Sequence, residues 1–68
     1  MKLEKWMQIT KIKKKSLAKQ LGITTSSLYH YTTGKRAPTL EISCKIEVIT
    51  EGKVTPQDLL DTWKEKNS

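Results

Sequence analysis

Three glycines, at positions 22, 34 and 52, divide the chain into short segments and so limit the folds open to it. The segment before each glycine places apolar side chains three or four residues apart, which is the spacing of one helix face. A helix commonly ends where the backbone turns into the left-handed region, which glycine enters without steric cost. No apolar–polar alternation extends beyond a few residues, so strands are not expected. The sequence therefore predicts an all-α fold of short helices.

Five helices are expected, and local start signals define where several of them begin. Their expected ranges are residues 3–10, 14–21, 25–33, 40–50 and 56 onward, with fraying at residues 64–66. Thr24 and Thr39 are good N-caps, because a threonine hydroxyl accepts hydrogen bonds from first-turn amides. Thr55, Pro56 and Asp58 give a stronger signal, a capping box with proline at the first helical position. A chain of 68 residues is expected to form one compact domain, residues 1–68.

The fourth expected helix has apolar side chains on two opposite sides. Leu40, Cys44 and Val48 form one stripe, and the other stripe consists of Ile42, Ile46 and Ile49. A helix that is apolar on both sides of so small a domain is either central or half-exposed at an interface. The sequence does not decide which stripe faces a partner.

Core and interface residues follow from these patterns. Trp6 and Met7 are expected in the core, and Cys44 is expected to be a buried, inert thiol. Tryptophan is enriched at the centres of interfaces, so Trp63 is expected at a contact between two copies, with closure of the core as its alternative role. The expected dimer contacts are Trp63, Leu59, Ile46 and Ile49.

Positive charge is concentrated in the first part of the chain. Residues 1–39 hold nine lysines and arginines against Glu4 alone, a net charge of +8, whereas residues 40–68 hold four lysines against six acidic residues, a net charge of −2. Such a division is expected when one face of a protein meets a polyanion. The alternative is charge that serves only solubility.

Composition argues against several classes of protein. No apolar run approaches the roughly 18 residues that cross a bilayer, and no signal peptide precedes the first helix, so a cytoplasmic protein without membrane contact is expected. One cysteine and one histidine provide neither an intrachain disulfide nor a zinc site. Because no catalytic triad, metal-ligand set or phosphate-binding loop is present, we expect no enzymatic activity, no metal and no cofactor.

Residues 14–31 have the spacing of a helix-turn-helix motif, which is expected to extend over about residues 14–33. Ala18 lets the second helix approach the third, and Gly22 makes the turn between them. Ile23, Leu28 and Tyr31 then fix the angle at which the helices cross. The alternative is an ordinary helical hairpin whose third helix only completes the core.

The sequence also resembles the phage repressor and Cro class of helix-turn-helix proteins. The resemblance rests on Ile12, on SLAKQLGI at residues 16–23 and on SLYHYTTGKRAP at residues 27–38, and it covers about residues 3–60. Residues 39–41, 45–46 and 54–59 are similar to the small Cro branch. Two positions depart from the family pattern. The family usually has a glutamine where this chain has Lys14, and a capping Ser or Thr where this chain has Lys13.

This resemblance implies a transcriptional repressor that binds double-stranded operator DNA with its third helix in the major groove. The implied assembly is a two-fold homodimer on a palindromic operator, weakly dimeric or monomeric when free, and needing no cofactor. One alternative is an antitoxin that binds its own operator and a toxin protein. Another is a protein-interaction module that has lost DNA binding. The operator sequence, the dimer strength, the choice between repression and activation, and a phage, plasmid or chromosomal origin remain open.

Lysines at the start of the second helix are expected to bind DNA phosphates. Cations near the positive end of a helix dipole are unfavourable by about 0.3–1 kcal/mol each, and an anion at the same place relieves this strain. The two basic residues after the third helix would lie beside the same backbone. The expected phosphate-binding residues are Lys14, Lys15, Ser16, Lys35 and Arg36. Solvated side chains without a role are the alternative.

The exposed face of the third helix is expected to read bases. Its candidate residues are Thr24, Thr25, Ser26, Tyr29 and His30. Hydroxyl groups read several bases weakly, and Tyr29 can pack on a sugar or a thymine methyl group, unless it is a partly buried core residue. Because Arg, Asn and Gln are missing from this face, specificity is expected to depend on water, DNA shape and dimer spacing.

Overall fold

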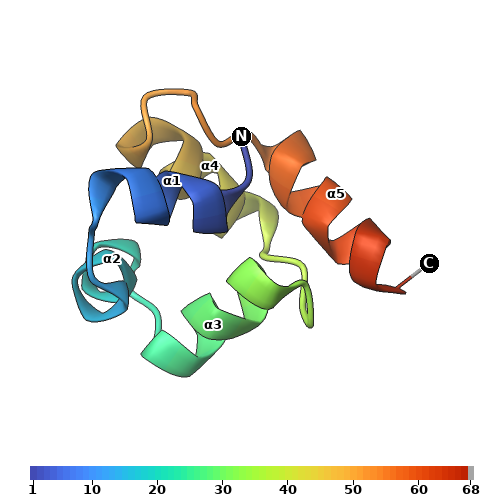
Figure 1. Ribbon diagram of the computed structural model, residues 1–68. Helices are drawn as coiled ribbons and strands as arrows, with labels where there is room; N and C mark the ends of the chain where they lie inside the picture. Colours follow the sequence, from blue (N-terminus) through green and yellow to red (C-terminus); the bar gives the residue numbers. More distant parts are fainter. Residues whose placement is uncertain (68) are drawn as a thin grey trace.

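The computed structural model describes residues 1–67 and contains five helices. They are α1 (Leu3–Thr10), α2 (Lys14–Leu21), α3 (Thr25–Thr33), α4 (Leu40–Ile49) and α5 (Pro56–Asn67), as Figure 1 shows. No strand occurs in these 67 residues, so the expected all-α fold is confirmed. The expected helix boundaries are also correct to within one residue, apart from the end of α5.

Three helices begin with the capping threonines that the sequence predicts. The hydroxyls of Thr24 and Thr39 each accept a hydrogen bond from the amide three residues on, at 3.1 and 3.3 Å. At α5, the Asp58 amide donates to Thr55 Oγ1 at 3.2 Å, and the Thr55 amide donates to Asp58 Oδ2 at 3.0 Å. This reciprocal pair is the capping box.

The turn between α2 and α3 is built around Gly22. Its φ of 73° is left-handed, and its amide donates to the Lys19 carbonyl at 3.2 Å while the Ile23 amide donates to the Ala18 carbonyl at 3.0 Å. This pair of bonds is a Schellman motif, which ends α2 and turns the chain sharply into α3. Ile23 packs against the core, as expected, and so fixes the direction in which α3 leaves the turn.

The core lies where all five helices and the loop before α5 meet. Trp6 and Met7 are buried, which confirms the expectation for α1, and Ala18 of α2 is buried as well. The buried apolar side chains are Leu3, Trp6, Met7, Leu17, Ala18, Leu21, Leu28, Tyr31, Ile46, Val54 and Leu59. No buried side-chain polar atom among residues 1–67 lacks a hydrogen-bond partner.

The structure decides which stripe of α4 faces the core. Ile46 is 0% exposed, whereas Leu40 and Val48 are 74% and 77% exposed. Cys44 is exposed as well, so the expectation of a buried thiol is wrong. The expectation failed because the stripe that carries Cys44 points away from the core, which is packed against Ile46 on another side of α4.

Two of the four expected dimer contacts are corrected by their burial. Ile46 and Leu59, with 0% and 2% exposed, lie inside the core and offer no surface to a second copy. Ile49 is partly buried against the same core. Trp63 is exposed, and so is its neighbour Leu60 on α5.

Helix α5 continues to Asn67 instead of fraying at residues 64–66. The Asn67 side-chain amide donates to the carbonyl of Gly34 at 2.9 Å and to that of Trp63 at 2.8 Å. Gly34 itself ends α3 with a φ of 81°, and a Cβ atom added there would lie 2.7 Å from the Thr62 carbonyl oxygen. The end of α3 and the last turns of α5 are therefore in close contact.

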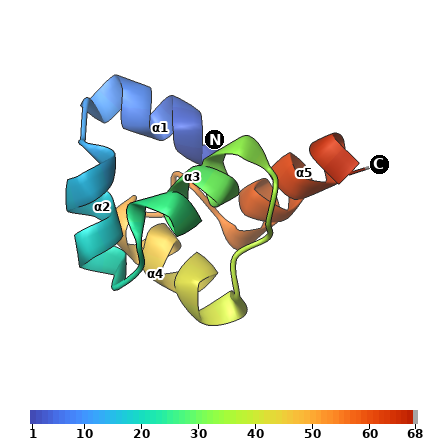
Figure 2. The same ribbon diagram turned by 90° about the horizontal axis from the view of Figure 1, so that it is seen from below.

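The arrangement leaves α3 between two neighbours. In both views α2 and α5 lie on opposite sides of the molecule, and α3 runs between them along one face (Figures 1 and 2). None of the helices is long and apolar enough to cross a membrane in the part of the chain that the structure describes.

Candidate nucleic-acid interface

The outward face of α3 carries the predicted base-reading side chains. Leu28 and Tyr31 are buried, as expected, and this orients the helix. Thr25 and Ser26 are exposed, Tyr29 is 44% exposed, and His30 is half-buried. A row of hydroxyl and ring groups therefore lies along the exposed side of a helix whose other side is fixed in the core.

Thr24 is exposed at the start of α3, and its hydroxyl already has two local hydrogen bonds. It accepts from the Ser27 amide at 3.1 Å and donates to the Ser27 hydroxyl at 3.0 Å. A hydroxyl has one proton and two lone pairs, so one acceptor site remains for an outside ligand. While Thr24 keeps its capping role, its hydroxyl can therefore accept one hydrogen bond from a base or a water molecule, but it cannot donate one.

The start of α2 lacks the features that stabilise most helix N-termini. Lys13 occupies the N-cap position with no side-chain hydrogen bond to the first turn, and that turn contains no acidic residue. Lys14, Lys15 and Ser16 are exposed. Unpaired backbone amides and positive side chains therefore gather at the positive end of the helix dipole.

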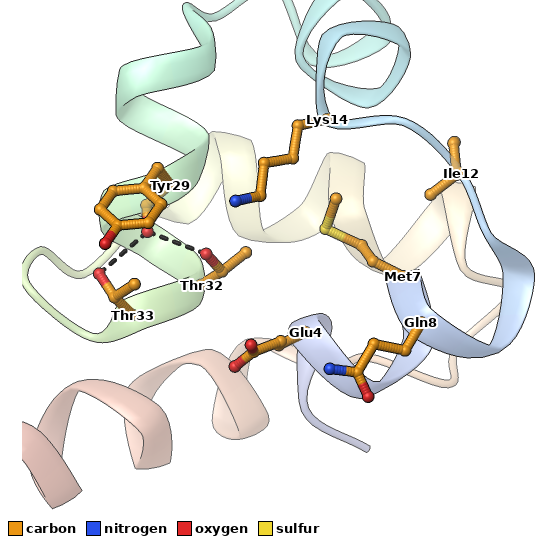
Figure 3. A pocket seen from close by; sticks show the side chains of 8 residues that line it. All are labelled: Glu4, Met7, Gln8, Ile12, Lys14, Tyr29, Thr32 and Thr33. Atoms are coloured by element: carbon orange, nitrogen blue, oxygen red, sulfur yellow. Dashed lines mark hydrogen bonds between the residues drawn. The ribbon is translucent and has the colours of Figure 1, made fainter.

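Lys14 and Tyr29 come together across a shallow pocket of about 280 Å³ between α1, α2 and α3. Figure 3 shows Lys14 extending toward the tyrosine ring, and its Nζ lies 4.8 Å from the ring centroid. The Thr32 and Thr33 hydroxyls below the ring donate to the Tyr29 carbonyl at 2.9 and 3.0 Å. Lys14 thus joins the start of α2 to the middle of α3.

The loop after α3 brings two more cations to the same region. Lys35 Nζ lies 5.9 Å from the Tyr29 ring centroid, and Arg36 is exposed. The Arg36 amide donates to the carbonyl of His30 at 3.3 Å, which holds the loop against the end of α3. Tyr29 therefore lies near basic residues from both ends of the helix-turn-helix.

Carboxylates pair with cations elsewhere in the molecule. The ion pairs within residues 1–67 are Met1–Asp58, Lys2–Glu65 and Lys45–Glu41. None of them involves Lys14, Lys15, Lys35 or Arg36, so in the described chain these four cations have no carboxylate within ion-pair distance. Their charge is left for solvent or for an anionic ligand.

The environment of Asp58 lowers the pKa of its carboxyl group. Burial raises its pKa, but hydrogen bonds from the N-terminal ammonium group and from Thr55, with the charge of that ammonium group, more than offset burial, so the pKa is lowered. This site belongs to the start of α5 and lies outside the basic surface. No group of three or more potential metal ligands occurs among the described residues.

Comparison with known proteins identifies the family. A family model described as helix-turn-helix matches residues 3–55. This chain belongs to the helix-turn-helix family. It is therefore a DNA-binding helix-turn-helix regulator of the broad lambda-repressor and Cro-like type. No curated protein and no solved structure matches it. The assignment to the small Cro branch stays a prediction.

The structure shows two features of this protein that the sequence did not reveal, one in the helix-turn-helix and one on α4. One is the convergence of Lys14 and Lys35 on the ring of Tyr29, which depends on the angle between helices. The other is the outward direction of the stripe formed by Leu40, Cys44 and Val48. That stripe was visible in the sequence, but its direction depends on where α5 packs.

Proposed function

We propose that this helix-turn-helix protein is a sequence-specific transcriptional repressor similar to phage Cro, with α3 lying in the major groove of its operator. The observation that supports this most is the set of exposed, carboxylate-free cations on both sides of α3. They come from the start of α2 and from the loop at residues 35–36. Occupation of an operator that overlaps a promoter excludes polymerase, so no chemical step is needed.

Phosphate contacts would position the helix in the groove. Lys14, Lys15 and Ser16 offer ammonium groups, a hydroxyl and free backbone amides at one point, and Lys35 and Arg36 offer two more donors beyond the other end of α3. Contacts of this kind set register and orientation without reading sequence. They also make binding weaken as the salt concentration rises.

Base reading would fall to Thr24, Thr25, Ser26, Tyr29 and His30. Hydroxyls donate to or accept from more than one base, and the threonine methyl groups can contact thymine. The bidentate pairings that Arg makes with guanine and Asn or Gln makes with adenine are missing from this set. Specificity would therefore depend strongly on DNA shape, ordered water and the spacing of two half-sites.

A second copy of the chain is the occupant that we propose for the exposed face of α4. Leu40, Cys44 and Val48 form this face, beside a shallow apolar groove of about 500 Å³. Glu41 and Lys45, 3.6 Å apart, run along one edge of it. If two α4 helices pack antiparallel with Cys44 at the two-fold axis, the Glu41 of each copy lies toward the Lys45 of the other. The surface is thus complementary to itself in charge as well as apolar.

Two measurements test this function together. Selection of bound sites from random duplex should return a palindrome, and sedimentation should show two chains on it and weak association without DNA. Absence of any protected or enriched site at modest salt would contradict the repressor. An asymmetric site bound by one chain would contradict only the dimer and would favour the antitoxin alternative, in which the α4 face holds a toxin.

A charge placed on α4 tests the dimer surface directly. Val48→Glu should prevent association while leaving the fold intact, because the side chain is 77% exposed. Ile9→Glu is the matched control, since Ile9 is also apolar and 58% exposed but lies on α1. Equal dimerisation by both variants would show that α4 is not the contact.

A further inference from the structure

The ring of Tyr29 is approached by lysines from two different elements. Lys14 is the first residue of α2, and its Nζ lies 4.8 Å from the ring centroid. Lys35 follows the glycine that ends α3, and its Nζ lies 5.9 Å from the same centroid. Both distances fall within the range of about 6 Å over which a cation is attracted to an aromatic ring. Lys14, Tyr29 and Lys35 are called the lysine–tyrosine cluster below.

This cluster holds two like charges close together without a carboxylate. Neither ammonium group forms an ion pair with any described residue, although Glu4 lines the pocket that Lys14 crosses. Because the two nitrogens lie 4.8 and 5.9 Å from the same ring centroid, the upper limit of their separation is somewhat above the screening length of about 8 Å at physiological salt. At any separation below that length, their repulsion is only partly screened. A single anion near both nitrogens would remove it.

The backbone of Tyr29 is the fixed part of the cluster, and the lysine side chains are its most flexible members. Tyr29 stands on a helix whose neighbouring residues Leu28 and Tyr31 are buried, and the carbonyl of Tyr29 accepts from Thr32 and Thr33. Lysine side chains have many rotamers, and ordering them at the moment of binding lowers affinity. If the Tyr29 ring already holds both ammonium groups in the free protein, less affinity is lost by ordering the lysine side chains on binding.

We propose that Tyr29 is a positioning residue whose ring holds Lys14 and Lys35 so that both ammonium groups bind one phosphate of the DNA backbone. This inference rests on the proposed DNA-binding function and changes the role of Tyr29 within it. The side chain arranges phosphate ligands and does not read a base. The aromatic face is the part that matters, and the phenolic hydroxyl is dispensable.

The geometry is tested first on the free protein. Ring currents of Tyr29 should displace the ε-methylene NMR signals of Lys14 and Lys35 from the ordinary lysine position, which Lys19 on the far end of α2 supplies as a reference. Tyr29→Phe should preserve the displacement, and Tyr29→Leu should abolish it. Because Tyr29 is 44% exposed, neither substitution removes core packing.

DNA binding is tested with a random-sequence duplex over a series of salt concentrations. Loss of two cation–π contacts at an exposed site predicts about five- to thirty-fold weaker binding by Tyr29→Leu, whereas Tyr29→Phe should stay within about two-fold of the unchanged chain. The slope of log K against log salt should fall by about one for Tyr29→Leu. Lys14→Met should then cost less affinity in Tyr29→Leu than in the unchanged chain, while the control Lys19→Met should cost the same in both.

Three results would overturn the proposal. Unchanged binding by Tyr29→Leu would show that the ring does not act on the lysines. A loss in Tyr29→Phe equal to that in Tyr29→Leu would show that the hydroxyl contacts DNA directly. Equal losses for Lys14→Met with and without the ring would show that the two residues act separately. In each case the unchanged chain still binds duplex. Failure of that chain to bind at low salt would instead remove the proposed function, and this inference with it.

Discussion

Helices α2 and α5 begin in opposite ways. Helix α5 starts with a capping box, in which the side chains of Thr55 and Asp58 each accept a hydrogen bond from the backbone amide of the other residue. The Asp58 carboxylate also accepts a hydrogen bond from the N-terminal ammonium group at 2.8 Å. Helix α2 starts with Lys13, Lys14 and Lys15, without a side-chain cap and without an acid in its first turn. The first arrangement satisfies the helix terminus from within the chain, and the second leaves it for a ligand.

We propose that this difference separates the residues that stabilise the fold from the residues that bind DNA. Caps contribute about 0.5–2 kcal/mol each, and a cation at a helix N-terminus opposes folding by about 0.3–1 kcal/mol. A substitution in the capping box at the start of α5 should therefore change stability and leave DNA affinity per folded molecule unchanged. A substitution at α2 should weaken DNA binding while stability stays level or rises. Four experiments can break or sharpen this contrast.

The largest effect is expected from Lys14→Met with Lys15→Met. Each phosphate contact makes log K fall by about 0.9 per decade of salt, so at 0.1 M salt each contact strengthens binding about eight-fold relative to 1 M. The double substitution should weaken binding to any duplex about 50-fold and lower the slope of log K against log salt by about two. Fluorescence anisotropy against salt measures both quantities. An unchanged slope would show that these lysines do not touch phosphate.

Loss of the cap at α5 should have the next largest effect. Thr55→Ala removes the hydroxyl that accepts from the Asp58 amide, which should lower the free energy of unfolding by about 1 kcal/mol in urea titrations. Affinity for duplex should stay the same at temperatures where the chain is fully folded. A parallel loss of affinity would mean that the start of α5 and the DNA-binding surface are not independent.

A cap introduced at α2 should have a smaller effect of opposite sign. Lys13→Thr places a hydroxyl at the N-cap position and removes one cation from it, so we expect about 0.5–1 kcal/mol more stability and slightly weaker binding. Lys13→Met, which removes the same charge without supplying a hydroxyl, is the matched control for the loss of charge alone. If both variants have equal stability, α2 does not lack a cap.

The smallest effect is expected from acid. Burial raises the pKa of Asp58, but the hydrogen bonds of the carboxylate with the N-terminal ammonium group and Thr55 outweigh it and bring the pKa below its ordinary value of 3.8. A lowered pKa means that the ionised form stabilises the fold. That stability is complete above pH 3.8 and is lost as the pH falls through the lower folded-state pKa. The comparison is urea unfolding at several pH values with Asp58→Asn, which should lose less stability in acid than the unchanged chain.

Much of the fold could be predicted because its helices are defined by local signals. The capping threonines and the Gly22 turn act within a few residues of their own positions, so periodicity and N-cap chemistry located them correctly. The end of α5 was missed because a distant contact, from Asn67 to Gly34, extends the helix. Sequence periodicity contains no information about a partner 33 residues away.

The candidate site and the interface were predictable to a lesser extent. The sequence located the exposed basic residues, because charge and helix position suffice for that. It did not reveal which α4 stripe is buried, and so placed Ile46 at an interface although it is 0% exposed. The approach of Lys14 to Tyr29 likewise depends on the crossing of α2 and α3. Both features are decided by how helices pack against each other.

The contact between Asn67 and Gly34 has a consequence for anyone who alters the ends of this protein. The side-chain amide of Asn67 donates a hydrogen bond to the Gly34 carbonyl, which immediately precedes Lys35 and Arg36. These two residues are predicted to contact DNA phosphates. Removal of the last turn of α5 should therefore free the loop after α3 and weaken its proposed contacts with DNA, although no predicted contact residue is changed. The last turn of α5 therefore supports the proposed DNA-binding surface, although it contains none of the predicted contact residues.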